Sequence, residues 1–255
     1  MEIKDSTIII TGGSSGLGAA TAELIVNQGG KAIIADVNDE QGNQLEDKLG
    51  DQASYIHCDV TNHDDAQKTV EAAMSKYGKL DGLVNCAGIA IGEKTISKNG
   101  PHKLESFEKV IKVNLIGTFN MIRLAADAMA KSPPNDKNER GVIVNTASVA
   151  AFDGQIGQAA YSASKGGIVG MTLPIARDLS RTGIRIMTIA PGIFETPMLQ
   201  GMPPDVQESL GKQVPFPSRL GKSTEFADLV VVIFKNVMLN GEAIRLDGAI
   251  RMTPK

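Results

Sequence analysis

Short apolar runs alternate along the chain with longer stretches in which apolar residues recur at helical spacing. The longer stretches predict helices, the clearest of them near 63–77, 105–130, 158–181 and 223–235. Such alternation implies a parallel sheet, and strands that are apolar throughout are typical of a sheet covered on both faces. The pattern therefore predicts an α/β fold, a doubly wound parallel sheet of about seven strands with helices on both faces. The expected strands lie within 7–11, 31–36, 53–60, 80–88, 141–148, 184–192 and 243–247.

The domain organisation follows from the absence of a break in this pattern. The 255 residues contain no internal repeat and no linker, so we expect a single domain over 1–255. Residues 192–221 are irregular and rich in proline and glycine. Long loops in compact domains are commonly lids or binding loops, so we expect a substrate loop there, with a surface excursion without a role as the alternative.

Composition narrows the function classes. Apolar residues make up 42% and charged residues 22% of the chain, and the net charge is −3. These values are ordinary for a globular protein and give no basic footprint for nucleic acid. No apolar stretch approaches the ~18 residues of a membrane span. The chain also runs almost directly into its first strand without a leader pattern. We therefore expect a cytoplasmic protein with no nucleic acid partner and no membrane insertion.

Metal and disulfide chemistry find little support in the sequence. Cys58 and Cys86 are too few for a disulfide framework, and each follows an apolar run. His57, His63 and His102 show no ligand spacing. We expect two reduced thiols and no metal site.

A glycine-rich turn, TGGSSGLG at 11–18, follows the first apolar run and opens the first helix. Gly12, Gly16 and Gly18 allow a tight turn and a close approach of backbone to a pyrophosphate at the helix N-terminus. The spacing differs from the tighter G-x-G-x-x-G, so a turn without a ligand is the alternative. The motif predicts a Rossmann-type dinucleotide site.

Asp36 strengthens that prediction because it closes the second strand. A carboxylate there accepts hydrogen bonds from both hydroxyls of the adenosine ribose and repels a 2′-phosphate. The next residue is Val37, where a basic side chain would favour NADP. We therefore expect NAD as the cofactor, with Asp59 and Val60 near the adenine. A solvent-exposed aspartate that begins a turn is the alternative.

Tyr161 and Lys165 stand four positions apart in QAAYSASKG, so on a helix they lie on one face. Taken with TGGSSGLG, NCAG at 85–88, Asn114 and Ser148, this pair resembles the short-chain dehydrogenase/reductase family. Within it, TASVAAFDGQIGQAAYSASKGG, VPFPSRLG and NGEAIRLDGAIRM are similar to the type-2 3-hydroxyacyl-CoA dehydrogenases, also known as 17β-hydroxysteroid dehydrogenases. Two residues depart from the pattern: Cys86, where asparagine is commoner, and Glu195, where a small residue is more familiar.

The resemblance implies roles for the reactive end of the site. Tyr161 exchanges the hydroxyl proton, and Lys165 lowers the pKa of that phenol and holds the nicotinamide ribose. Ser148 binds the substrate oxygen. Asn114 kinks its helix and anchors a water chain from Lys165 to solvent. On their own, a tyrosine packed against its neighbours and a serine that caps a turn are the plainer alternatives.

The remaining expected contacts complete the site. We expect the substrate to contact Gln155 and Gln158 in addition to Ser148. Besides the residues already named, the cofactor is expected to contact Ser15, Leu17, Cys86, Ala87, Gly88, Phe194 and Thr196.

The implied reaction interconverts a secondary alcohol and a ketone, with 3-hydroxyacyl-CoA as the expected substrate. The loops 91–104 and 192–221 would form an acyl pocket, and Lys94, Lys98 and Lys103 would meet CoA phosphates, although loop lysines are more often merely solvated. The alternatives are a hydroxysteroid or other apolar alcohol as substrate, or a cofactor-binding partner protein without catalysis. The resemblance also implies a homotetramer of D₂ symmetry, assembled through the helices at 105–130 and 158–181 and through the final strand region.

Overall fold

The computed structural model describes residues 1–196, 199 and 204–254. Its centre is a sheet of seven parallel strands in the order β3-β2-β1-β4-β7-β8-β9. The predicted doubly wound parallel sheet is confirmed. The strands are β1 (Thr7–Thr11), β2 (Lys31–Asp36), β3 (Ala53–His57), β4 (Gly82–Asn85), β7 (Gly141–Thr146), β8 (Ile184–Pro191) and β9 (Ala243–Leu246).

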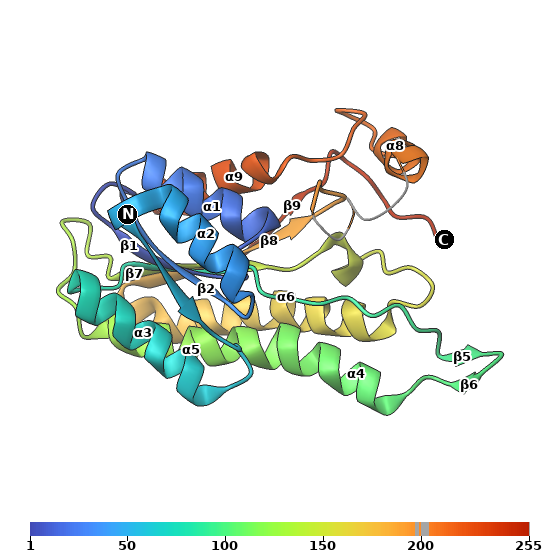
Figure 1. Cartoon of the computed structure of the whole chain (residues 1–255), viewed down its shortest axis with the longest axis horizontal. Helices are drawn as coiled ribbons and strands as arrows, with labels where there is room; N and C mark the ends of the chain where they lie inside the picture. Colours follow the sequence, from blue (N-terminus) through green and yellow to red (C-terminus); the bar gives the residue numbers. More distant parts are fainter. Residues whose placement is uncertain (197–198, 200–203, 255) are drawn as a thin grey trace.

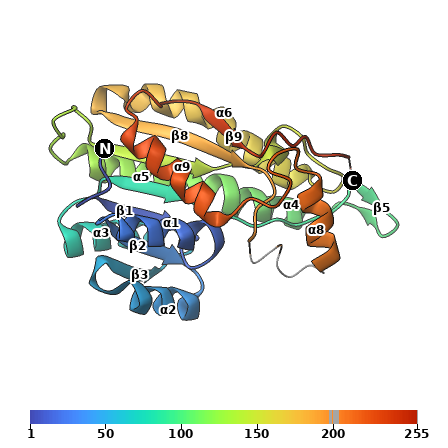
Figure 2. The ribbon, with the colours of Figure 1, turned by 90° about the horizontal axis from the view of Figure 1, so that it is seen from above.

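Helices cover both faces of this sheet (Figures 1 and 2). The first layer is formed by α1 (Gly16–Asn27), α2 (Asp39–Leu49) and α9 (Ser223–Lys235). The second is formed by α3 (His63–Tyr77), α4 (Leu104–Ile111), α5 (Thr118–Ala130) and α6 (Ala159–Leu179). No helix in the part of the chain that the structure describes combines the length and hydropathy needed to cross a bilayer.

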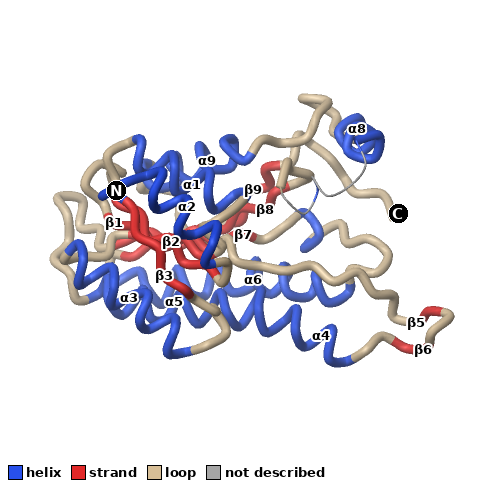
Figure 3. The backbone as a smooth tube through the Cα atoms, viewed as in Figure 1, coloured by secondary structure: helices blue, strands red, loops and turns tan. Residues whose placement is uncertain are grey.

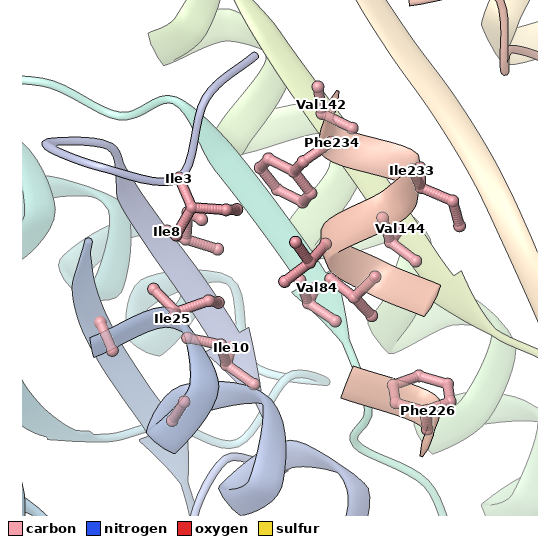
Figure 4. Close-up of a cluster of buried hydrophobic side chains, with 14 of the residues drawn as sticks. Ile3, Ile8, Ile10, Ile25, Val84, Val142, Val144, Phe226, Ile233 and Phe234 are labelled. Carbon is pink, nitrogen blue, oxygen red and sulfur yellow. The ribbon is translucent and has the colours of Figure 1, made fainter. Parts of the chain in front are cut away.

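The two layers divide the apolar side chains of each strand between them. Successive side chains of a strand point to opposite faces, so Ile8 and Ile10 pack toward α1 and α9, whereas Ile9 packs toward α3 and α5. Figure 4 shows the first of these clusters, with Phe234 of α9 lying over the strands. Burial on both faces is why the central positions of strands such as β1 are apolar in succession rather than at every second position.

The strand order reverses beside β1, and this reversal decides where a ligand can bind. The chain runs from β1 outward to β2 and β3, and then returns to pair β4 with the other side of β1. The loops after β1 and β4 therefore leave the sheet in opposite directions and open a crevice at the carboxyl ends of the strands. Figure 3 shows α8 (Pro204–Lys212) and the β5–β6 hairpin at the same end of the molecule, α8 on its upper side and the hairpin on its lower side.

The helix predicted over 105–130 differs from the observed one. It is interrupted by a turn of π-helix at Lys112–Gly117 that separates α4 from α5. Asn114 lies in this wider turn, and π-turns within α-helices frequently mark functional sites. The third strand is also shorter than predicted, because Cys58 to Val60 lie beyond its end at His57.

Two loops contain structure that the sequence pattern did not predict. Residues 91–104 include a hairpin of β5 (Ile96–Ser97) and β6 (Gly100–Pro101). The irregular segment 192–221 contains α8, which begins at Pro204 and carries a Glu208–Lys212 pair one turn apart. Residues 197, 198 and 200–203 of the predicted substrate loop lie outside the described residues.

Candidate active site

A cavity of about 770 Å³ opens at the carboxyl ends of the strands. Every residue expected to be catalytic or to contact the cofactor, except Asn114, contributes to its lining, as do Gln155 and Gln158, whereas Lys94, Lys98 and Lys103 lie outside it. The chain thus brings the glycine turn after β1, the ends of β2 and β4, the start of α6 and the loop after β8 around one space. Glu195, a departure from the family pattern, is exposed and lies outside the lining.

The glycine turn is packed so closely that side chains are excluded from it. A Cβ on Gly12 would lie 2.7 Å from the backbone nitrogen of Ala87, and one on Gly18 would overlap the carbonyl oxygen of Gly12. Gly12 and Gly16 also have positive φ angles of 59° and 52°. The first turn of α1, which follows, has N–H groups without intrahelical acceptors. This bare backbone cradle fits a dinucleotide pyrophosphate.

Asp36 links the glycine turn to the end of β2. Its two carboxylate oxygens accept hydrogen bonds from the backbone nitrogens of Ser14 and Asn38, each at 3.1 Å. Both bonds hold the carboxylate at the cavity wall beside Val37. The position suits a contact with ribose hydroxyls.

Cys86 follows β4 and lines the cavity beside Ala87 and Gly88. Burial raises the pKa of its thiol to about 11, although a hydrogen bond from Thr146 works in the opposite direction. A thiol with this pKa stays protonated at neutral pH and makes a poor nucleophile. The departure from the family pattern at Cys86 therefore adds no nucleophile to the site.

Ser148 and Tyr161 both line the reactive end of the cavity, and the Ser148 hydroxyl lowers the pKa of the Tyr161 phenol. Ser148 precedes a short 3₁₀ turn, and its Oγ accepts a hydrogen bond from the backbone nitrogen of Ala150 at 3.1 Å. Tyr161 lies in the first turn of α6. The hydrogen bond from Ala150 therefore fixes the position of the Ser148 hydroxyl beside Tyr161.

Lys165 lies one turn after Tyr161 and is almost fully buried. Its Nζ donates a hydrogen bond of 2.7 Å to the carbonyl oxygen of Thr146 and lies 5.7 Å from the centroid of the Tyr161 ring. Burial lowers the pKa of Lys165 to about 8. A buried ammonium is tolerated here because the carbonyl at the end of β7 replaces part of its hydration.

The pKa of Tyr161 differs from the sequence-based expectation. Burial raises it, and the hydrogen bond with Ser148 lowers it in part. Lys165 was expected to lower the pKa of Tyr161, but without a bound cofactor the protein raises it. The reason is that Lys165 contacts the face of the ring, while the surrounding protein disfavours a charged phenolate.

Asn114 lies behind the cavity rather than in its wall. Its Oδ1 accepts from the backbone nitrogen of Ile89 at 2.8 Å, and its Nδ2 donates to Ile89 O at 2.9 Å and to Ser164 Oγ at 3.0 Å. These bonds tie the segment after β4 to α6. The water chain implied by the family resemblance stays a prediction.

Two features of the site had no signal in the sequence. Thr146 contributes a backbone carbonyl, which any residue type would supply. Met252 lines the cavity although it lies far along the chain from every motif. Gln155 and Gln158 do line the cavity, and they also bond each other, because Gln158 Oε1 accepts from the Gln155 backbone nitrogen at 3.0 Å.

Comparisons with known proteins agree with this geometry. A family model described as short chain dehydrogenase matches residues 6–207. The 3-hydroxyacyl-CoA dehydrogenase type-2 of Drosophila melanogaster is 55% identical over 99% of this chain and 100% of its own length. The protein of that name from Homo sapiens is 56% identical over 99% and 97%. A crystal structure of 3-hydroxyacyl-CoA dehydrogenase type-2 from Mycobacterium avium superposes with a TM-score of 0.92 at 40% identity, over 98% of this chain and 97% of that one. These matches confirm the resemblance drawn from the motifs.

Replacing Lys165 by methionine should change how stability depends on pH. The pKa of Lys165 is depressed from 10.5 to about 8, so between these values the unfolded chain binds a proton that the folded chain has lost. The free energy of unfolding should therefore rise with pH across this window, by about 3 kcal/mol in all. Urea unfolding from pH 7 to 10.5 should show this rise in the wild type relative to Lys165→Met. The exposed Lys68→Met serves as control, and identical pH dependence in all three proteins would contradict the assignment.

Proposed function

The chain belongs to the short-chain dehydrogenase family, and we propose that it is an NAD-dependent 3-hydroxyacyl-CoA dehydrogenase. It would oxidise the 3-hydroxyl of an acyl-CoA to a ketone and catalyse the reverse reduction. The observation that carries the proposal is one cavity with a glycine cradle and Asp36 at one end and Ser148, Tyr161 and Lys165 at the other. The names of relatives at 55% and 56% identity support the substrate.

Tyr161 and Ser148 supply the proton transfer that this reaction requires. The Tyr161 oxygen takes the proton of the substrate hydroxyl, and Ser148 Oγ hydrogen-bonds the same oxygen as negative charge develops on it. In the reductive direction the Tyr161 hydroxyl returns a proton to the carbonyl oxygen. When bound, NAD⁺ supplies the hydride acceptor and a positive charge that favours the ionised phenol.

The other residues of the cavity hold and orient the two ligands. Gly12, Gly16 and Gly18 receive the pyrophosphate, and Asp36 binds the adenosine ribose and disfavours a 2′-phosphate. Lys165 binds the second ribose, next to the reacting carbon. The remaining cofactor contacts are proposed for Ser15, Leu17, Asp59, Val60, Cys86, Ala87, Gly88, Phe194 and Thr196.

The substrate end of the cavity is mainly apolar, which suits an acyl chain. Ile91, Val149 and Leu199 line it together with the two amides of Gln155 and Gln158. The β5–β6 hairpin begins beside it, because the Glu93 backbone nitrogen donates to Gly157 O at 2.9 Å. The hairpin segment carries Lys94, Lys98 and Lys103, which we propose as partners for CoA phosphates.

Assembly into a homotetramer is part of the proposal. Ile116 of the π-turn and Phe119 of α5 are 54% and 48% exposed, and Leu173 and Val232 expose further apolar surface elsewhere. Exposed apolar groups of this kind are typical of protein interfaces. Two different isologous contacts would generate D₂ symmetry.

A substrate and cofactor panel tests the proposed function. The highest kcat/KM should be obtained with 3-hydroxybutyryl-CoA and NAD⁺, and a 17β-hydroxysteroid should be poorer. NADP⁺ should be at least about tenfold worse, a difference of about 1.4 kcal/mol. Asp36→Asn should reduce the preference for NAD⁺ over NADP⁺. The control Asp47→Asn, at an exposed aspartate, should leave that preference unchanged. A higher kcat/KM on the steroid would instead identify a hydroxysteroid dehydrogenase.

Replacing Tyr161 by phenylalanine removes only the hydroxyl that exchanges the proton. The value of kcat should fall by roughly 10²–10⁴-fold, the usual contribution of general acid–base catalysis. NAD⁺ binding, measured by calorimetry, should change little. Tyr77→Phe, in α3 and away from the cavity, is the matched control. Full turnover by Tyr161→Phe would favour a cofactor-binding protein without this catalytic machinery.

The assembly is tested by placing a charge on the exposed surface beside the π-turn. Light scattering of the wild type should give a mass four times the 26.9 kDa chain. Phe119→Glu should give smaller species, because an isologous contact would bury two like charges. Phe216, 83% exposed in a different loop, provides the control Phe216→Glu. A wild-type monomer would rule out the tetramer.

A further inference from the structure

The segment after β9, residues 248–254, begins with a turn at 248–249 and continues as an irregular tail that reaches back to the cavity. It forms no helix or strand, and Figures 1 and 2 show it running toward the end of the molecule that carries α8 and the β5–β6 hairpin. Met252, at its centre, lines the cavity, whereas its neighbours Arg251 and Thr253 are exposed. The tail thus contributes one flexible apolar side chain to the site.

Two hydrogen bonds hold the far part of the tail against the loop that precedes α6. The Ile156 backbone nitrogen donates to Pro254 O at 3.0 Å, and Gln155 Nε2 donates to Thr253 O at 3.0 Å. These bonds flank Met252 on its C-terminal side. Gln155 therefore has a task besides lining the cavity, since its amide positions the tail.

An ion-pair cluster holds the near part of the tail. Arg245 of β9 contacts Asp153 at 2.6 Å and Asp247 at 2.7 Å. The same guanidinium donates to Ile250 O at 3.0 Å, and the Ile250 side chain is buried. Both ends of the tail are thus fastened to the loop 153–158, and Met252 lies between the two attachments.

The same loop is attached on its other side to the β5–β6 hairpin, through the Glu93–Gly157 hydrogen bond. Gln155 and Gln158 belong to this loop, so the tail lies at the substrate end of the cavity rather than beside the glycine cradle. Methionine is unbranched and adapts its shape to the groups beside it. A side chain of this kind suits a wall that contacts apolar chains of different lengths.

On the basis of the proposed function, we propose that Met252 is a specificity-determining residue that forms the end wall for the acyl chain, and that Gln155 positions it through the tail. The chemistry it recognises is the unbranched apolar chain of a 3-hydroxyacyl thioester. The reacting hydroxyl and the dinucleotide do not contact this wall. A change at Met252 should therefore act on discrimination between chains and leave the interaction with NAD⁺ unchanged.

The test compares kcat/KM for 3-hydroxydodecanoyl-CoA and 3-hydroxybutyryl-CoA. Met252→Ala should raise the ratio of long to short substrate, and Met252→Trp should lower it about tenfold, the size of effect that one or two methylenes have in a hydrophobic pocket. The KM for NAD⁺ should stay unchanged in both variants. Met238→Ala, at a methionine that is 86% exposed, is the control. An unchanged ratio in both Met252 variants would overturn the inference.

Two further measurements separate this inference from the proposed function. If the wild type oxidises neither thioester, the proposed function fails, and the same ratio is measured with 2-octanol and 2-butanol. If the Met252 variants change the ratio of kcat/KM for 2-octanol to that for 2-butanol, the role of Met252 is supported. An unchanged ratio would contradict it. The positioning role is read by trypsin cleavage after Arg251, followed by intact mass, which should be faster in Gln155→Ala than in the wild type. Equal cleavage rates would show that Gln155 does not hold the tail.

Discussion

The pairing of β1 with β2 on one side and with β4 on the other is the constraint on which the rest of the structure depends. Because both neighbours are parallel to β1, all three strands end at the same edge of the sheet. Because their loops diverge, that edge opens instead of closing. The glycine turn, Asp36 and the segment 86–88 come together there although they are far apart in sequence. The remaining strands extend this edge and bring Thr146 and Ser148 to it.

The buried ammonium of Lys165 is the most demanding feature of the site. Its burial lowers its pKa to about 8, and the Thr146 carbonyl at 2.7 Å is the group that makes a charge tolerable there. Burial also raises the pKa of Tyr161. The protein alone therefore keeps the phenol protonated, which is the form needed to reduce a ketone. Under the proposed function, the positive charge of a bound oxidised cofactor would favour the ionised phenol, and the direction of proton transfer would then be coupled to the state of the cofactor.

The loop 153–158 joins three parts of the chain that are remote in sequence. It contacts the stem of the β5–β6 hairpin through Gly157, the tail through Gln155 and Ile156, and β9 through Asp153. Each contact uses a common group: a backbone amide, the side-chain amide of Gln155 or an ion pair. Together these contacts bring the hairpin segment, the loop 153–158 and the tail to one end of the cavity.

The sequence by itself determined the order and type of the main elements, because burial on both faces leaves continuous apolar runs that are easily read. It also predicted the chemistry of the site, since Gly12, Tyr161 and Lys165 stand in motifs that together resemble the short-chain dehydrogenase/reductase family. The tertiary structure alone decided the helix α8, the carbonyl that supports Lys165 and the position of Met252, and it gave the expected kink at Asn114 the form of a π-turn. These depend on contacts between distant segments or on backbone atoms, neither of which leaves a signature in residue type. The same holds for the pKa of Tyr161, which is set by the protein packed around the ring and not by its neighbour one turn away.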